Sequence, residues 1–174
     1  MRIVAGKWRG RTIRAPKGDR VRPTGDRARE AWMSILQADL PGARVLDLFA
    51  GSGALGLEAL SRGAAFGDFV DLAEPSLRTL RENASTLGAL GDIAIHRAEA
   101  LRYAQKLEPL AYDITFADPP YNLGLAPRLA RLWLFQPFSR LLGVEHDVHE
   151  PMPEGGATRT YGGTAITIYR ATTG

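Results

Sequence analysis

The sequence predicts an α/β fold with a mostly parallel central sheet. Short apolar runs alternate with stretches of good helix formers along most of the chain, at a spacing typical of right-handed βαβ units. The run at 44–49 has apolar residues on both faces, as expected of a central parallel strand. Near the end of the chain, the segments 158–161 and 164–170 flank a Gly-Gly pair and predict a closing hairpin.

The other predicted elements follow in chain order. Residues 1–13 predict a small basic hairpin with glycines at its turns, and residues 26–40 predict a helix that ends before a Pro-Gly pair. Ala31, Ile35 and Leu36 share the apolar face of that helix. The alternating part of the chain has strands at 44–49, 66–71, 93–97, 112–117 and 141–145, and helices at 53–62, 76–87, 99–107 and 126–135.

Length and composition limit the possible classes. A chain of 174 residues fits one domain, 1–174, with a basic extension at 1–25 and a core at 26–174. We expect a cytoplasmic protein without a membrane partner, because no apolar stretch is long enough for a span or a signal peptide. The absence of cysteine excludes disulfides and thiolate metal sites. His146–Glu150 comes nearest to a metal-binding pattern, but an ordinary polar loop is the favoured interpretation, so no metal ion is expected.

An Asp-Pro-Pro-Tyr segment, from Asp118 to Tyr121, narrows the function most. Pro119 and Pro120 lack the N–H that a strand ladder needs, so the segment predicts a rigid loop after the strand at 112–117, at the edge where open α/β sheets bind ligands. Asp118 and the Pro119 carbonyl can accept both N–H bonds of an exocyclic amine, which frees its lone pair to attack an electrophile. The ring of Tyr121 can stack on the attached base. A plain surface turn is the alternative.

The glycine-rich segment after the first strand predicts where the electrophile binds. Gly51 and Gly53 allow a ligand to approach the backbone closely, and Phe49 and Ser52 complete the loop. This pattern matches a dinucleotide-binding loop equally well. Asp47 favours S-adenosylmethionine over a dinucleotide, because a carboxylate at the strand tip attracts a ligand ammonium and repels a pyrophosphate. S-adenosylmethionine carries such an ammonium, and a dinucleotide does not.

Acidic residues after the next two strands complete the predicted nucleoside site. Asp71 lies 18 residues after Gly53, a position from which a carboxylate accepts hydrogen bonds from ribose hydroxyls, and Glu74 is the alternative. Glu99 and Ala100 follow the third strand and are placed to bind the adenine. A glutamate in the first turn of a helix is also favourable by itself, so both interpretations of Glu99 stay open.

The N-terminal segment is strongly basic. Residues 1–30 hold ten basic and three acidic side chains, whereas the rest of the chain holds more acidic than basic ones and the whole carries +3. Such asymmetry is typical of nucleic-acid binding. The predicted RNA-binding residues are Lys7, Trp8, Arg9, Arg11 and Arg22, since arginine pairs with phosphate and tryptophan can stack on a base. The alternative is a solvated hairpin with its tryptophan packed on the body.

Together these residues resemble the bacterial RsmD-type methyltransferases, which methylate the N2 amine of a guanine in small-subunit rRNA and belong to the class I S-adenosylmethionine-dependent methyltransferases. The resemblance rests on residues 2–11, 22–30, Asp47–Gly53, Asp118–Tyr121 and Tyr161-Gly162. The glycine and Asp-Pro-Pro-Tyr motifs alone would allow many amino-methylating enzymes. The two N-terminal motifs point to this family.

The resemblance implies a Rossmann-like three-layer fold with a seven-stranded sheet whose last inserted strand is antiparallel. It implies S-adenosylmethionine as the cofactor and 16S rRNA, within the 30S subunit or an assembly intermediate, as the partner of a monomeric enzyme. The resemblance also implies guanine 966 as the target nucleotide. Three departures are visible: Asp71 replaces the usual Glu, Gly25 replaces the usual Thr, and residues 112–145 match well only around the Asp-Pro-Pro-Tyr segment.

Other functions remain possible on the sequence alone. The acceptor amine could be adenine N6 in DNA or a glutamine amide. A nicotinamide oxidoreductase would explain the glycine loop, but it leaves Asp47 and the Asp-Pro-Pro-Tyr segment unexplained. An RNA-binding module with an inactive methyltransferase fold is disfavoured because the motifs are intact.

Overall fold

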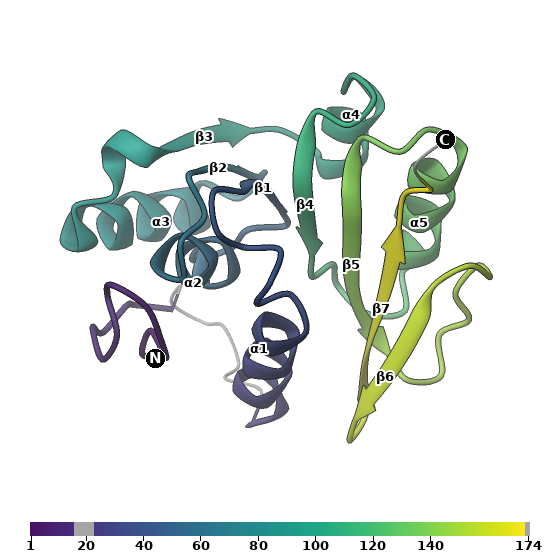
Figure 1. Cartoon of the computed structure of the whole chain (residues 1–174), viewed down its shortest axis with the longest axis horizontal. Coiled ribbons are helices and arrows are strands. Elements are labelled where there is room, and N and C mark those ends of the chain that lie inside the picture. The colour runs from purple at the N-terminus through teal and green to yellow at the C-terminus, as the bar shows by residue number, and fades with distance from the viewer. Residues whose placement is uncertain (16–22, 173–174) are drawn as a thin grey trace.

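The computed structural model describes residues 1–15 and 23–172 (Figure 1). The strands are β1 (Arg44–Leu48), β2 (Phe66–Asp71), β3 (Ile93–Arg97), β4 (Tyr112–Ala117), β5 (Ser139–Asp147), β6 (Ala157–Tyr161) and β7 (Thr164–Arg170). The helices are α1 (Pro23–Ile35), α2 (Ala54–Ser61), α3 (Glu74–Leu87), α4 (Ala100–Gln105) and α5 (Leu125–Phe135), and a short 3₁₀ turn, η1, spans Leu90–Asp92.

All seven strands form one sheet in the order β3-β2-β1-β4-β5-β7-β6. Strands β1 to β5 are parallel, whereas β7 lies antiparallel between β5 and β6. The predicted α/β class, the mostly parallel sheet and the inserted antiparallel strand are therefore confirmed.

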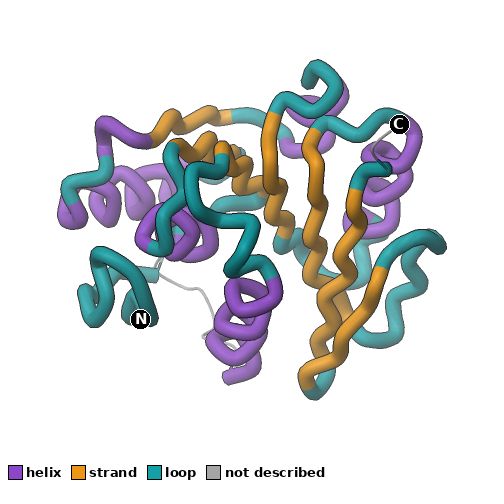
Figure 2. Tube along the Cα trace, in the orientation of Figure 1, coloured by secondary structure: helices purple, strands orange, loops and turns teal. Residues whose placement is uncertain are grey.

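Helices cover both faces of the sheet, which gives three layers (Figure 2). One apolar cluster joins α1, α2 and α3 to one face, and Trp32 is among its largest fully buried side chains. The second cluster joins α4 and α5, with Trp133, to the other face. Neighbouring residues of β1 serve opposite clusters: Val45 packs in the first, and Leu46 and Leu48 pack in the second. This two-sided burial is why β1 is apolar on both faces.

The first helix differs from its prediction at 26–40. It begins three residues earlier, at a proline that suits a helix start, and ends at Ile35. Beyond it, the N–H groups of Gln37 and Asp39 bond to carbonyls three residues back, so the chain tightens into turns. Ala31 and Ile35 are only half buried. The buried face of the helix consists of Ala28, Trp32 and Met33, and Leu36 is buried just beyond its end.

Most other boundaries agree with the prediction to within two residues. Strands β2, β3, β4 and β7 match it completely. Strand β5 is longer than the predicted 141–145, because it pairs with β4 from Ser139 onward and with β7 as far as Asp147. Strand β1 stops before Phe49, whose positive φ of 59° breaks the extended backbone.

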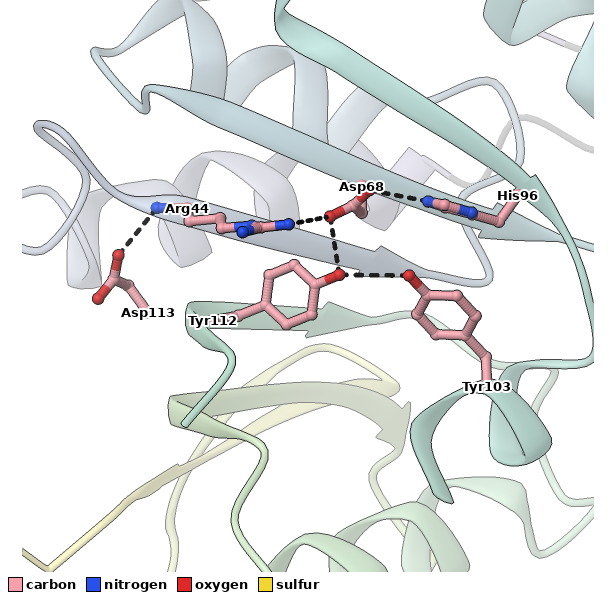
Figure 3. A network of polar contacts seen from close by, with 6 residues as sticks. All are labelled: Arg44, Asp68, His96, Tyr103, Tyr112 and Asp113. Carbon is pink, nitrogen blue, oxygen red and sulfur yellow. Dashed lines mark hydrogen bonds and ion pairs between the residues drawn. The ribbon is translucent and has the colours of Figure 1, made fainter. Parts of the chain in front are cut away.

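A polar network around the buried carboxylate of Asp68 connects α4 to the sheet (Figure 3). Asp68 accepts a hydrogen bond of 2.7 Å from the Tyr112 hydroxyl and lies 2.8 Å from Nε2 of His96. The Tyr112 hydroxyl lies 3.2 Å from that of Tyr103 on α4. Burial raises the pKa of both tyrosines, so both hydroxyls keep their protons and remain donors. The network thus holds α4 and the β3–α4 turn at the edge of the predicted site.

Candidate functional site

The predicted cofactor loop and the Asp-Pro-Pro-Tyr loop lie side by side at the carboxyl edge of the sheet. Leu48, the last residue of β1, pairs with Ala117, the last residue of β4. Phe49 and Asp118 therefore leave adjacent strands at the same level. Asp71 ends β2, which flanks β1 on its other side. The fold thus brings together three segments that are far apart in the sequence.

The glycine loop, Phe49–Gly53, has an unusual backbone. Phe49, Gly51 and Gly53 all have positive φ, at 59°, 56° and 85°. A Cβ at Gly53 would overlap the end of the Leu80 side chain on α3, and the left-handed backbone at this position favours glycine in any case. A Cβ at Gly51 would meet nothing within 4 Å. Gly51 is therefore the glycine that faces open space, where a ligand can approach the backbone.

Asp71 ties the glycine loop to the next turn. Its Oδ2 accepts a hydrogen bond of 2.8 Å from the N–H of Gly51, and its Oδ1 accepts one of 2.9 Å from the N–H of Ala73. Glu74, the alternative ribose ligand, instead pairs with arginines on α3 and β3. Of the two candidates, Asp71 is the one bonded to the glycine loop, and its role toward a ribose stays a prediction.

Asp47 lies beneath the glycine loop. Its side chain is 1% exposed, and its Oδ2 accepts a hydrogen bond of 3.0 Å from the N–H of Gly56 in α2. Burial raises the pKa of Asp47 well above the ordinary value, the hydrogen bond opposes this rise, and the nearby charge of Asp71 adds to it. The observed contact braces the start of α2. A cation placed beside this carboxylate would offset its desolvation, and contact with a ligand ammonium stays a prediction.

Glu99 caps α4 with both carboxylate oxygens. They accept hydrogen bonds from the N–H groups of Leu101 and Arg102, at 3.2 and 2.8 Å. The structure therefore supports the helix-start interpretation of Glu99, and binding of adenine stays a prediction. Ala100 is buried in the second apolar cluster, so its side chain packs rather than facing a ligand.

A groove of about 790 Å³ opens beside Glu99. Ala98 and Glu99 line it at the tip of β3, Leu72 lines it after β2, and side chains of α4 and α5 complete it. The glycine loop and the Asp-Pro-Pro-Tyr loop do not line this groove. It lies at the end of the site where the nucleoside was predicted.

Side chains of β5 and β7 form hydrogen bonds to the Asp-Pro-Pro-Tyr loop. Asp118 and Tyr121 are half buried. The Tyr121 hydroxyl donates to Oε1 of Glu145 on β5 at 2.9 Å, and it also lies 2.9 Å from Oγ1 of Thr164 on β7. Sequence reasoning missed Glu145 and Thr164, because only the insertion of β7 beside β5 brings them to this loop. Pro119 is buried, which fits a rigid loop.

The N-terminal arm, residues 1–15, is docked on α2 and α3 rather than extended. The N–H groups of Val4 and Ala5 donate to the Glu58 carboxylate at 2.9 and 3.2 Å, and the N–H of Trp8 donates to Oγ of Ser61 at 3.0 Å. Glu58 is 1% exposed and was not predicted. The two ends of the arm pair antiparallel, as the predicted hairpin requires. Arg2 and Thr12 form a bridge, and the N–H groups of Ile3 and Ile13 donate to the carbonyls of Arg11 and Met1, at 2.9 Å each.

The predicted RNA-binding residues differ in their availability. The Trp8 side chain is packed in the first apolar cluster and is 9% exposed, which supports the packing alternative, and stacking of its ring on a base stays a prediction. The Lys7 ammonium lies 4.5 Å from the centre of the Trp8 ring. Arg9 and Arg11 are exposed, and Arg11 donates to the Thr86 carbonyl at 2.7 Å. Arg22 lies outside the described residues.

The segment His146–Glu150 is not simply a loop. Its first residues belong to β5, and His146 is buried with Nδ1 2.9 Å from the Asp147 carbonyl and Nε2 2.7 Å from Oγ1 of Thr167. Within residues 1–15 and 23–172, no group of three or more His, Asp or Glu is placed to hold a metal ion. In the same part of the chain, no helix has the length and apolarity that a membrane crossing requires.

The chain is similar to known proteins along most of its length. Residues 1–170 match the family model described as Conserved hypothetical protein 95. Ribosomal RNA small subunit methyltransferase D of Escherichia coli is 38% identical over 159 residues, which cover 88% of this chain and 78% of that protein. The structure of a hypothetical protein from Thermus thermophilus superposes with a TM-score of 0.83 at 29% identity, covering 98% of this chain and 99% of that one.

More distant structures share the fold. An RNA methyltransferase from Salinibacter ruber, solved in complex with S-adenosyl-L-homocysteine, has a TM-score of 0.66 at 14% identity and covers 86% of this chain and 93% of its own. The architecture is therefore that of the class I methyltransferases. The family match and the identity to the methyltransferases D show that the chain belongs to the Conserved hypothetical protein 95 family, the RsmD-type methyltransferases that its motifs predicted.

Proposed function

We propose that this enzyme transfers a methyl group from S-adenosylmethionine to the exocyclic N2 amine of a guanine in 16S rRNA. Membership of a family whose relatives are named rRNA small subunit methyltransferases supports methylation of rRNA. The observation that carries the finer proposal is the adjacency of the glycine loop and the Asp-Pro-Pro-Tyr loop at the ends of β1 and β4. It puts a cofactor loop beside a loop suited to an amine on a flat base.

The cofactor is S-adenosylmethionine, and the residues at the carboxyl edge fit it. Gly51 faces open space, and the buried carboxylate of Asp47 lies below the same loop. Asp71 and Glu99 are the acidic groups on the nucleoside side. The cofactor supplies an electrophilic methyl group, whose transfer to nitrogen breaks the carbon–sulfur bond and leaves both electrons on sulfur.

The Asp-Pro-Pro-Tyr loop acts on the acceptor base. Asp118 and the Pro119 carbonyl accept the two N–H bonds of the amine, which favours its pyramidal form and directs the lone pair. Once methylated, the nitrogen is acidic and releases a proton to Asp118 or to water, so no strongly basic side chain is required. The target guanine must leave its stack to enter the site, where the ring of Tyr121 stacks on it.

The N-terminal arm supplies RNA affinity. Arg9 and Arg11 are exposed on the docked arm, where they can contact phosphates, whereas the buried ring of Trp8 serves the packing of the arm. The 1–25 extension and the core at 26–174 then act as one catalytic domain. The substrate is 16S rRNA in the 30S subunit or an assembly intermediate, and the enzyme acts as a monomer.

The experiment that tests this function uses ribosomal subunits from a strain that lacks the gene. The purified enzyme and methyl-labelled S-adenosylmethionine are incubated with 30S subunits, and the rRNA is digested to nucleosides and analysed by mass spectrometry. We expect label in N2-methylguanosine, and primer extension then locates the nucleotide. Label in N6-methyladenosine, or no label in any rRNA, contradicts the proposal.

A further inference from the structure

The hydroxyl group of Tyr121 has more contacts than a stacking role requires. Stacking on a base uses only the ring. In the structure the hydroxyl also lies within 2.9 Å of both Oε1 of Glu145 and Oγ1 of Thr164. These two partners come from β5 and β7, so the tip of the side chain is bonded to the sheet while its backbone belongs to the loop after β4.

Both partners are rigidly held. Glu145 is 5% exposed and Thr164 is 3% exposed, within the ladder that pairs β5 with β7. The loop itself is less protected, since Pro120, Asn122 and Leu123 are exposed. The hydroxyl of Tyr121 therefore connects an exposed loop to a buried, hydrogen-bonded part of the sheet.

The hydrogen bonds have a defined direction. Tyr121 has a single hydroxyl proton, which it donates to the Glu145 carboxylate, so the Thr164 hydroxyl donates in turn to the oxygen of Tyr121. Burial and the charge of Glu145 raise the pKa of Tyr121, so the phenol keeps its proton. A chain of two donated bonds restrains the tip of the ring, because moving it would break both.

We propose that Glu145 and Thr164 are positioning residues that fix the ring of Tyr121 as the platform for the acceptor base. This inference rests on the proposed function, in which the base stacks on that ring. Methyl transfer needs the attacking nitrogen in line with the methyl group, and small misplacements reduce rates strongly. A platform bonded to the sheet sets the plane of the base and therefore the approach of its amine.

Kinetics of Tyr121→Phe test the positioning. This variant keeps the stacking ring and loses both hydrogen bonds. We expect KM for 30S subunits to stay within about twofold and kcat to fall by roughly tenfold, because the base still binds but is less well oriented. Thr164→Val should lower kcat in the same way, while Thr164→Ser, which keeps the hydroxyl, should restore it.

A double variant separates positioning from general damage. In the Tyr121→Phe background there is no hydroxyl for Thr164 to hold, so adding Thr164→Val should cause no further loss of kcat. Thr158→Val is the matched control, because it removes a hydroxyl that bonds to Thr167 on the same hairpin, at 2.8 Å, three positions along β7 from Thr164. Multiplicative losses in the double variant, or an equal loss in the control, overturn the proposal.

A spectroscopic measurement tests the contact without any substrate. In protein labelled with ¹³C at the tyrosine ζ carbon, the Tyr121 signal is the one absent from Tyr121→Phe. We expect this signal to shift in Glu145→Gln and Thr164→Val and to stay in place in Thr158→Val. An unmoved signal refutes the tether whatever the substrate is. A shifted signal in an enzyme that methylates no guanine refutes the proposed function and leaves the tether standing.

Discussion

Gly6 and Gly10 offer a matched pair for testing how the N-terminal arm is docked. Both glycines have left-handed backbone, with φ of 88° and 82°. Alanine at either position therefore meets a similar backbone strain of about 1–2 kcal/mol. The surroundings differ completely. A Cβ at Gly10 would meet nothing within 4 Å, whereas a Cβ at Gly6 would overlap the backbone carbonyl of Ser61 in α2.

The structure gives the size of the difference. Relief of the overlap at Gly6 moves the arm away from Ser61, which makes three hydrogen bonds to it. The Ser61 carbonyl accepts from the N–H of Lys7 at 2.9 Å, and the Ser61 hydroxyl accepts from the N–H of Trp8 at 3.0 Å and donates to the Ala5 carbonyl at 2.7 Å. At about 1 kcal/mol for each bond, Gly6→Ala should destabilise the fold by about 3 kcal/mol more than Gly10→Ala.

Urea unfolding followed by circular dichroism measures both variants against the native chain. We expect Gly10→Ala to lower the free energy of unfolding slightly and Gly6→Ala to lower it by the larger amount. Tryptophan fluorescence should change in Gly6→Ala at zero denaturant, since Trp8 is buried in the docked arm. Equal losses in the two variants, with unchanged fluorescence in both, would show that the arm does not rest on Ser61.

The remaining predictions concern the site. Asp118→Ala should lower kcat by about 10²-fold or more in single-turnover assays on 30S subunits, with the fold intact by circular dichroism, and full activity would remove this carboxylate from the mechanism. Charge reversal at Arg9 and Arg11 should raise KM for 30S subunits and flatten its salt dependence without changing the affinity for S-adenosylhomocysteine, whereas unchanged RNA binding would exclude the arm as the RNA contact. Asp71→Ala should weaken S-adenosylhomocysteine binding by about 1–3 kcal/mol in calorimetry, and tight NAD binding by the native protein would overturn the cofactor assignment.

The sheet was predictable from the sequence because its strands are short, apolar and separated by glycine and proline. Four of the seven strands begin and end at the predicted residues. The first helix was displaced because its apolar pattern continues to Leu36 and Leu40, two residues that are buried although they lie beyond the end of the helix. Periodicity reports burial, and here burial continues through a turn.

The loops of the candidate site were predictable from the sequence, but the buried residues that form hydrogen bonds to them were not. The glycine and Asp-Pro-Pro-Tyr motifs are local in sequence, so each can be recognised without the fold. Glu145 and Thr164 reach Tyr121 only because β7 is inserted next to β5. Likewise Glu58, an acidic residue within a helix of good helix formers, gave no signal that it would be buried under the arm.

The arm also differs from a separate RNA-binding extension in one respect that matters for the site. Asn83 on α3 is 2% exposed, and its side chain bonds to both the N–H and the carbonyl of Arg14 at the end of the arm, at 2.8 Å each. Its amide nitrogen also donates to the carbonyl of Ser52 in the glycine loop at 3.0 Å. A single buried side chain thus joins the arm to the glycine loop, because an amide can donate and accept at once. Docking of the basic arm and the shape of the glycine loop are therefore coupled through one buried amide.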